Sequence, residues 1–352
     1  MNPDSAVFGA EKEGIESTFI MRNLPNLRSF CIDEIQDDEQ LLPLANCHHV
    51  ILEDMPSLSS VYLPMNLFLH VTDVQLKNIG GLVGYFLDYF PCVANGLSDV
   101  NCPLVNSIGI VNTKLNSTLK TLNLTQFVNL REIHIGNDCC EGVEEVTIVG
   151  LRHLNEITIG ENAFTKKGYK PEDGTDASRR FCLKDCEFLQ ELQIGAGSFM
   201  DYSVCEIENL PNLRQLQIGK PKSAGNRGCF HWSSLELKNI PSLKEMVIGA
   251  GCFCYCSRVV IEDFERLERI QVGSGAFCFV PGSEEENSTL VMRNLANLLV
   301  LTASSDASCF VNVKRVVFED LPSLSIVSLP QCAFKSRTVL ETKNISQRLS
   351  RL

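Results

Sequence analysis

One short phrase returns twelve times along the 352-residue chain; ten copies start with an Asn or Asp, and a leucine, or in one copy a valine, stands four residues after the start. Its clearest copies are NLPNLRQLQIG, from Asn209 to Gly219, and NIPSLKEMVIG, from Asn239 to Gly249. Two further copies begin at Asn23 and Asp320. Self-similarity at a fixed period is the signature of a solenoid, in which each unit contacts only its neighbours. The chain therefore predicts an elongated repeat array with one continuous core.

The leucine that follows the proline slot gives the length of the unit. It falls at Leu27, Leu58, Leu82, Val105, Leu130, Leu154, Leu189, Leu213, Leu243, Leu267, Leu298 and Leu324. The commonest spacing is 24 residues, and wider gaps, such as the 35 residues from Leu154 to Leu189, indicate insertions. The base unit is thus about 24 residues long, within the 20–29 residues of leucine-rich repeats.

Each unit carries two short alternations of apolar residues. Met246 and Ile248 share one parity, so we expect both to face inward on a short strand. A glycine follows that strand at Gly136, Gly160, Gly195, Gly219, Gly249 and Gly273, where it suits a tight turn with positive φ. The second alternation precedes the phrase, as at Leu235 and Leu237. Stacked units then predict two parallel sheets around one core, with little helix.

Two further columns recur in the alignment of the units. A phenylalanine stands five residues after the last inward residue, at Phe68, Phe164, Phe199, Phe253, Phe277 and Phe334, and we expect it to plug one end of each coil. A polar ladder occupies the first slot of the phrase, at Asn23, Asp54, Asn78, Asn101, Asp185, Asn209, Asn239, Asp263, Asn294 and Asp320. Asn and Asp side chains bond nearby backbone groups in turns, so this ladder predicts satisfied turns.

Composition excludes several classes of partner. The chain has 31 Lys and Arg against 43 Asp and Glu, a net charge of −12, which disfavours nucleic acid and anionic membrane surfaces. No apolar run approaches the roughly 20 residues that cross a bilayer. Met1 to Ser17 lacks the apolar centre of a signal peptide, so we expect a cytoplasmic protein with reduced thiols. Four sequons, at Asn116, Asn123, Asn287 and Asn344, instead favour an extracellular or cell-surface protein if a leader is missing.

The 16 cysteines follow the repeat. Cys139, Cys229, Cys252 and Cys309 stand directly before the phenylalanine slot, where other units have Ala or Ser. Because a free cysteine behaves as a small buried hydrophobe, this column predicts packing and not a disulfide framework. The CFCYC run from Cys252 to Cys256 has spacings unlike those of structural zinc sites. Cys47, His48 and His49 are expected in an inserted loop, so no metal and no cofactor is predicted.

The motifs IGENAF (Ile159 to Phe164), IGAGCF (Ile248 to Phe253) and VGSGAF (Val272 to Phe277) resemble leucine-rich repeats, nearest to the BspA-like class. The resemblance covers roughly Thr18 to Phe334. It implies an adhesion or interaction protein and carries no catalytic residues. We therefore expect a tail or cap over residues 1–17, one solenoid domain over 18–334 and a cap or tail over 335–352. Asp99 departs from the pattern, which predicts distortion of the third and fourth units.

Long gaps place polar insertions between the phenylalanine turn and the next unit. They cover Thr165 to Arg180, Lys220 to Gly228 and Pro281 to Ser288. Insertions at one repeat slot map to one face of a solenoid, so all three should emerge on the same edge. The first is polar and contains glycine, which predicts a mobile loop. These insertions are either tolerated surface additions or loops that contact a partner.

The outward positions of the first strand offer the best candidate site. One outward column contains Glu132, Glu156 and Glu191, and the other contains Tyr62, Phe86 and His134. Stacked carboxylates on neighbouring strands repel each other, and a basic partner would offset that repulsion. Exposed aromatics are common anchors of interfaces. The sequence therefore predicts that Tyr62 and Phe86 anchor a protein partner, and that the three glutamates with His134 face its basic segment. A solvated polar sheet without a partner is the alternative interpretation.

Two other functions stay open. An extracellular adhesin or glycan-binding repeat protein is the first, and a β-solenoid polysaccharide lyase is the second and more remote one. A lyase needs acids and bases that converge on one groove, but the outward columns contain many acids and essentially one base, Arg269. No phosphate-binding glycine loop, nucleophile elbow or paired zinc ligands occur in the sequence. We therefore expect a non-enzymatic protein-interaction scaffold.

Overall fold

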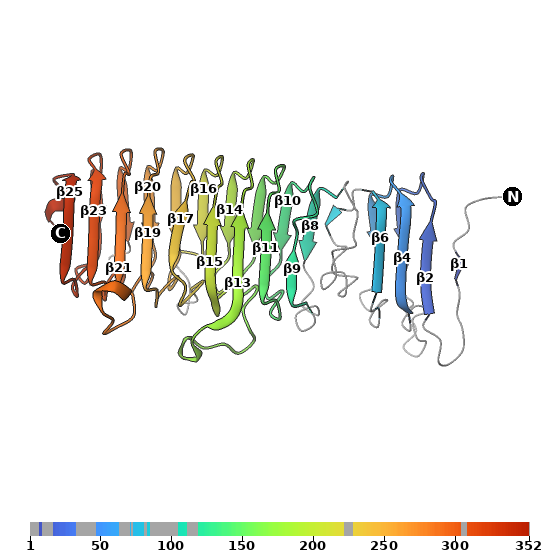
Figure 1. Ribbon diagram of the computed structural model, residues 1–352, viewed down its shortest axis with the longest axis horizontal. Helices are drawn as coiled ribbons and strands as arrows, with labels where there is room; N and C mark the ends of the chain where they lie inside the picture. Colours follow the sequence, from blue (N-terminus) through green and yellow to red (C-terminus); the bar gives the residue numbers. More distant parts are fainter. Residues whose placement is uncertain are drawn as a thin grey trace.

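The protein is a single stack of two-stranded coils, elongated along the stacking axis (Figure 1). The computed structural model describes residues 7–8, 17–32, 47–62, 71, 73–80, 83–84, 105–110, 119–221, 228–303 and 308–351. Besides strands and turns, these residues form three short 3-10 helices, at Pro171–Asp173, Glu285–Asn287 and Leu349–Arg351. None of the described residues belongs to a helix long and apolar enough to span a membrane.

The strands assemble into two long parallel sheets. The first sheet has ten strands: β7 (Val83–Gly84), β8 (Ser107–Ile110), β10 (Glu132–Ile135), β12 (Glu156–Ile159), β14 (Glu191–Ile194), β16 (Gln215–Ile218), β18 (Glu245–Ile248), β20 (Arg269–Val272), β22 (Val300–Ala303) and β24 (Ile326–Ser328). The second sheet has nine: β9 (Thr121–Asn123), β11 (Glu145–Val149), β13 (Asp176–Lys184), β15 (Tyr202–Glu208), β17 (Leu235–Lys238), β19 (Arg258–Glu262), β21 (Thr289–Arg293), β23 (Arg315–Leu321) and β25 (Val339–Ile345).

The N-terminal coils form two smaller sheets. One contains β1 (Val7–Phe8), β2 (Ser17–Arg22), β4 (Cys47–Met55) and β6 (Asp73–Ile79), and the other contains β3 (Ser29–Cys31) and β5 (Ser60–Tyr62). Strand β1 is antiparallel to β2, whereas β2, β4 and β6 pair in parallel. At the other end, β25 lies within residues 335–352 and pairs with β23, so the C-terminal segment adds a strand to the second sheet.

Alternating burial explains why these short segments form strands. On β18, Met246 and Ile248 are fully buried. Val247, which lies between them, and Glu245, which precedes them, are half-buried. The neighbouring strands align Leu216 with Met246 and Met246 with Ile270, so each inward side chain stacks on its counterpart in the next coil. Burying one such side chain contributes about 1.5–3 kcal/mol. The predicted solenoid of two parallel sheets around one core is therefore confirmed.

A column of phenylalanines runs through the core along one edge. Phe164, Phe199, Phe230, Phe253, Phe277, Phe310 and Phe334 are buried, and consecutive rings stack with centroids 4.6–5.7 Å apart. Each has a positive φ, between 51° and 60°. The amide of each bonds a carbonyl of the preceding coil, as from Phe253 N to Cys229 O at 2.9 Å. The plugging role predicted for this column is confirmed for its described members, and the column also includes Phe230 and Phe310, which the spacing rule missed. Phe68 lies outside the described residues.

The polar ladder lies at the opposite edge. Every described member has a positive φ, from 50° at Asn78 to 64° at Asp263, and Asn344 extends the ladder by one coil with φ 48°. Side chains bond from coil to coil, from Asn209 Nδ2 to Asp185 Oδ1 at 2.9 Å and from Asn239 Nδ2 to Asn209 Oδ1 at 3.0 Å. Asn and Asp tolerate left-handed backbone better than other residues with a side chain, which explains the column.

The glycines after the first strand act differently from the prediction. Among Gly160, Gly195, Gly219, Gly249 and Gly273, Gly219 alone has a positive φ, of 75°. At the other four, a Cβ would come closer than 3.0 Å to backbone atoms of the preceding coil. Glycine is therefore needed because consecutive coils approach each other closely here, and a left-handed turn is not the general reason.

The insertion at residues 165–180 contains the 3-10 helix Pro171–Asp173 and the start of β13, and contacts to the body hold it. The mobility expected of this loop stays a prediction. One local expectation was wrong. Cys47, His48 and His49 open strand β4 and do not lie in an inserted loop. The segments at 165–180 and 281–288 both emerge beside the phenylalanine edge, as predicted (Figure 1). Residues 222–227 of the third insertion lie outside the described residues, so its position stays a prediction. Asp99 lies outside the described residues.

Candidate functional site

The outward face of the first sheet carries four of the predicted site residues in strict register: Glu132, His134, Glu156 and Glu191. Glu132 on β10 pairs with Glu156 on β12, which pairs with Glu191 on β14. In the second column, His134 pairs with Thr158, which pairs with Gln193. The inward neighbours Ile133, Ile157 and Leu192 anchor each strand in the core. The two columns read from the sequence are thus adjacent rows of side chains on one surface.

The three glutamates form an uncompensated acidic row. Glu132 and Glu156 are exposed, and Glu191 is half-buried. No described Lys, Arg or His forms an ion pair with any of the three. Thr158 Oγ1 donates to Glu156 Oε1 at 3.0 Å. Carboxylates on strands about 4.8 Å apart repel each other, so this row costs stability.

On the outward face of the second sheet, in contrast, the acidic side chains form ion pairs with Lys and Arg. Lys184 Nζ lies 2.8 Å from Glu206 Oε2 and 2.9 Å from Glu208 Oε1. The Lys184 ammonium holds the pKa of Glu206 below its usual range. The same pattern of cation against carboxylate on neighbouring strands continues along the sheet at Arg180–Glu206, Arg258–Glu236, Arg293–Glu262, Arg293–Glu319, Arg315–Glu341 and Lys343–Glu319. Lys238 and Glu236 form a further ion pair within β17.

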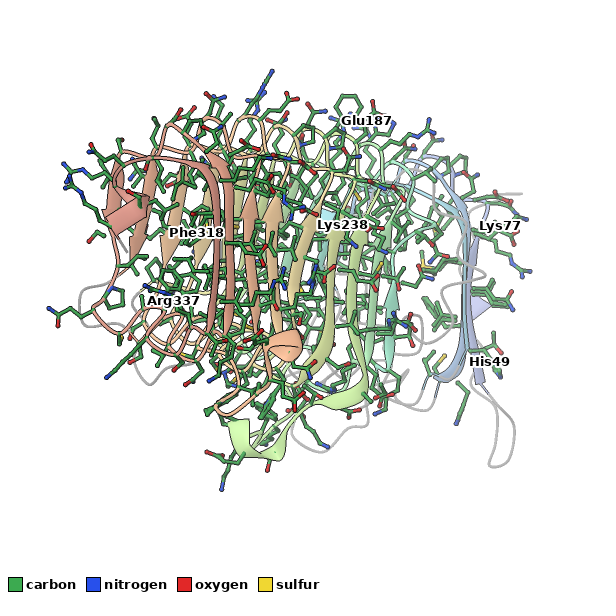
Figure 2. All side chains as sticks on the ribbon, turned by 60° about the vertical axis from the view of Figure 1, so that its left-hand side comes forward. His49, Lys77, Glu187, Lys238, Phe318 and Arg337 are labelled. Carbon is green, nitrogen blue, oxygen red and sulfur yellow. The ribbon has the colours of Figure 1, made fainter. Side chains whose placement is uncertain are left out.

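This paired face also contains apolar side chains. Val260, Val291 and Val317 lie in register on β19, β21 and β23 with the parity of the outward residues, yet they are at most 7% exposed. They form a small cluster of their own, separate from the main core. Arg258 and Arg315 line a shallow hollow beside them. The long charged side chains therefore cover the valines, and the second sheet presents a self-neutralised surface (Lys238 in Figure 2).

The sequence did not single out this charge pairing. The signal was present in the outward positions of the second strand, where acids and bases alternate from unit to unit. This alternation indicates charge pairing only when the strand register is known. The register places Glu208 opposite Lys184 on one neighbouring strand and Lys238 on the other. A one-residue slip would have moved all of these side chains into the core.

The predicted aromatic anchors are placed only in part. Tyr62 ends strand β5, where its backbone is in register with Cys31 on β3. The side chain of Tyr62 and the whole of Phe86 lie outside the described residues. Their proposed role therefore stays a prediction, whereas Glu132, His134, Glu156 and Glu191 are brought together by β10, β12 and β14.

The cysteines of the repeat lie in the core. Cys229, Cys252 and Cys309 are fully buried free thiols. Burial raises the pKa of Cys309 to about 12 and that of Cys254 to about 12, so these thiols stay protonated. The described residues contain no group of three His, Cys, Asp or Glu side chains arranged to hold a metal ion.

Comparison with known proteins gives no information on the function of this chain. No protein-family model matches the chain, and no curated protein matches it. Among solved structures, it is similar to a leucine-rich repeat protein from Bacteroides ovatus, with 12% sequence identity over 97% of this chain and 90% of that chain, at a TM-score of 0.25. That likeness is too slight to carry an argument. The protein is a leucine-rich-repeat solenoid on the basis of its own 24-residue repeat and its in-register parallel strands.

Proposed function

We propose that the protein is a non-enzymatic scaffold that binds a protein partner on the outward face of its first sheet. Glu132, Glu156 and Glu191 receive a basic segment of the partner, with His134 beside them. Tyr62 and Phe86 anchor the partner toward the N-terminal coils. The phenylalanine edge and the polar ladder have structural roles in packing and turns, so neither is proposed as the binding site.

The contrast between the two sheets supports the proposal. Strands of the second sheet neutralise outward acids with Lys and Arg on their neighbours, so this fold readily accommodates such pairing. Strands β10, β12 and β14 place three carboxylates side by side, and no Lys, Arg or His among the described residues pairs with them. On the described strands of the second sheet, the neighbouring acids Glu206 and Glu236 both have cations beside them. A row of acids without such cations is most simply explained by a cation supplied from outside. The paired counterpart on this sheet, Arg269 Nε at 3.8 Å from Glu245 Oε1, lies further along the stack.

Capture from native lysate at low and high salt tests the proposal. The test variant is the triple substitution Glu132→Gln, Glu156→Gln, Glu191→Gln, and a second variant is Tyr62→Ala, Phe86→Ala. The matched control neutralises three exposed turn glutamates, Glu187→Gln, Glu265→Gln and Glu268→Gln, so that net charge changes equally. Glu187 lies at the edge of the polar ladder, away from the sheet face (Figure 2).

A partner that binds wild type and the control, but is lost from the glutamate variant, supports the acidic row. Binding should also weaken as salt rises, because exposed charges are screened beyond about 8–10 Å at physiological ionic strength. If the control variant loses the partner equally, the effect of the glutamate variant comes from the change in net charge and not from the acidic row. A partner that binds all variants alike, at any salt, would contradict the proposal.

A further inference from the structure

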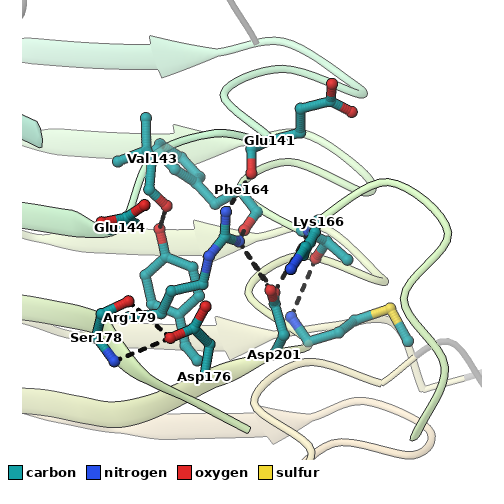
Figure 3. A network of polar contacts seen from close by, with 12 residues as sticks. Glu141, Val143, Glu144, Phe164, Lys166, Asp176, Ser178, Arg179 and Asp201 are labelled. Carbon is teal, nitrogen blue, oxygen red and sulfur yellow. Dashed lines mark hydrogen bonds and ion pairs between the residues drawn. The ribbon is translucent and has the colours of Figure 1, made fainter. Parts of the chain in front are cut away.

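The longest insertion forms a strap, residues 165–180, whose two ends meet at one buried aspartate. The backbone amide of Lys166 donates to Asp201 Oδ1 at 3.4 Å, and Arg179 Nη1 lies 2.9 Å from Asp201 Oδ2 (Figure 3). The backbone amide of Asp176 donates to Asp201 O at 3.0 Å. Asp201 is 1% exposed and Arg179 is 3% exposed. The base of the strap is thus clamped to the body of the solenoid.

Arg179 strengthens this clamp with its remaining donors. It donates to the carbonyls of Phe164 and Glu141, and its guanidinium lies 5.4 Å from the ring centroid of Tyr202. Tyr202 in turn donates its hydroxyl to Val143 O at 2.7 Å. The buried ion pair is therefore surrounded by partners, as a charge inside a protein requires.

The tip of the strap rests on His231 and Trp232, two aromatic residues that follow Phe230 of the phenylalanine column. Trp232 Nε1 donates to Pro171 O at 3.0 Å. The ring of Tyr169 covers that of His231, with centroids 5.9 Å apart. On its other side, Trp232 stacks on Tyr255 at 4.6 Å. In contrast to the base, the tip is held by one hydrogen bond and by ring contacts.

His231, under the tip of the strap, is a buried polar side chain without hydrogen bonds to its ring nitrogens. It is 1% exposed, and neither ring nitrogen has a hydrogen-bond partner; the hydroxyl of Tyr169 also has none. Burial lowers the pKa of His231 to about 4, against a smaller opposite effect of the Glu172 carboxylate on the strap. A buried imidazolium needs acceptors or water for its two N–H groups, and movement of the Tyr169 ring away from His231 would open a path for water.

We propose that the strap is an acid-released cover, in which protonation of His231 detaches residues 167–174 from His231 and Trp232 while the clamp at Asp201 holds the base. Release exposes the Trp232–Tyr255 stack at this edge. The inference is independent of the function proposed for the first sheet.

The sign of the pH effect follows from the two titrating groups. His231 has a pKa of about 4 when covered and an ordinary value near 6.5 in water, so acidification from about pH 6.5 to about pH 4 favours the released tip. Asp201 acts in the opposite direction: burial raises its pKa more than Arg179 lowers it, so the clamped form binds a proton better. Acid therefore loosens the tip and leaves the base closed.

The full chain reports release directly, because Trp232 is its one tryptophan. Between about pH 7.5 and about pH 4.5, we expect its emission to move to longer wavelength. Hydrogen exchange of residues 167–174, corrected for the intrinsic pH dependence, should rise by about tenfold or more. The far-UV circular dichroism of the sheets should stay constant. Loss of the sheet signal in the same transition, or unchanged exchange at the tip, would overturn the proposal.

Three variants separate His231 from general acid effects. His231→Phe keeps a buried ring without a titrating group and should abolish release in this range. Glu172→Gln removes the carboxylate that favours the imidazolium in the covered state, so release should move to higher pH. His153→Phe, at an exposed histidine, is the matched control and should behave as wild type. Release of His231→Phe at the wild-type pH would also refute the idea.

Discussion

At the scale of single residues, two kinds of side chain occupy left-handed backbone in this fold for different reasons. Asn and Asp do so at little cost, as at Asn239 with φ 53°. A phenylalanine at φ 52°, as in Phe253, costs about 1–2 kcal/mol. Burial of the ring, worth about 1.5–3 kcal/mol, and stacking, worth about 0.5–1.5 kcal/mol, offset that cost. The sequence revealed both columns, but the left-handed turn at phenylalanine contradicts the local preference of that residue.

Gly249→Ala tests the close approach of coils. We expect it to cost about 2 kcal/mol or more, because the new Cβ would meet the backbone of Gly219 and Lys220. Gly168→Ala is the control: φ is 76° there, and no atom lies within 4 Å of the added Cβ. It should cost about 1 kcal/mol from the backbone alone. Urea unfolding compares the two, and equal losses would contradict the stacking explanation.

At the scale of elements, the polar ladder combines a backbone requirement with a side-chain hydrogen bond. Asn239→Gly removes the bond to Asn209 but keeps a residue suited to positive φ, whereas Asn239→Ala loses both. We expect about 0.5–1 kcal/mol for Gly and about 1–2 kcal/mol for Ala. The free energy of urea unfolding measures the difference. A smaller loss for Ala than for Gly would show that left-handed backbone is not what the column selects.

The strands of the repeat could be predicted from the sequence, whereas the ordered strap at residues 165–180 could not. Both strands of each unit could be read from alternation, because inward residues such as Leu216 and Leu237 must avoid water in every coil. The strap could not, because its order depends on Asp201, which is 35 residues from Lys166 and 22 from Arg179 in sequence. Nothing in a polar, glycine-containing segment indicates that a distant carboxylate will hold both its ends.

At the scale of the whole molecule, charge is divided between two faces. The second sheet is neutralised by its own cations, and the first sheet concentrates on β10, β12 and β14 acids that form no ion pair within the described part of the chain. Of the candidate site, the sequence located the acidic row and His134 by parity alone. It could not show that the row is exceptional, because that judgement needs the ion pairs of the other sheet.

Glu156→Gln should therefore stabilise the isolated protein while it weakens partner binding. Removing the central charge relieves repulsion from Glu132 and Glu191, which we expect to be worth about 0.2–1 kcal/mol at low salt. The gain should shrink as salt rises. Thermal unfolding at two salt concentrations measures it. The paired control Glu236→Gln should destabilise, because Arg258 and Lys238 lose their acceptor.

The sequence by itself determined the repeat, its 24-residue period, the parity of the strands and the columns of Phe and of Asn or Asp. These follow from local chemistry that every coil repeats: apolar residues must face the core, and turns need residues that tolerate them. The tertiary structure decided the close packing at the glycines, the pairing of charges on the second sheet and the clamp at Asp201. Each of these joins residues more than 20 positions apart, so it exists only once parallel register has placed one coil against the next.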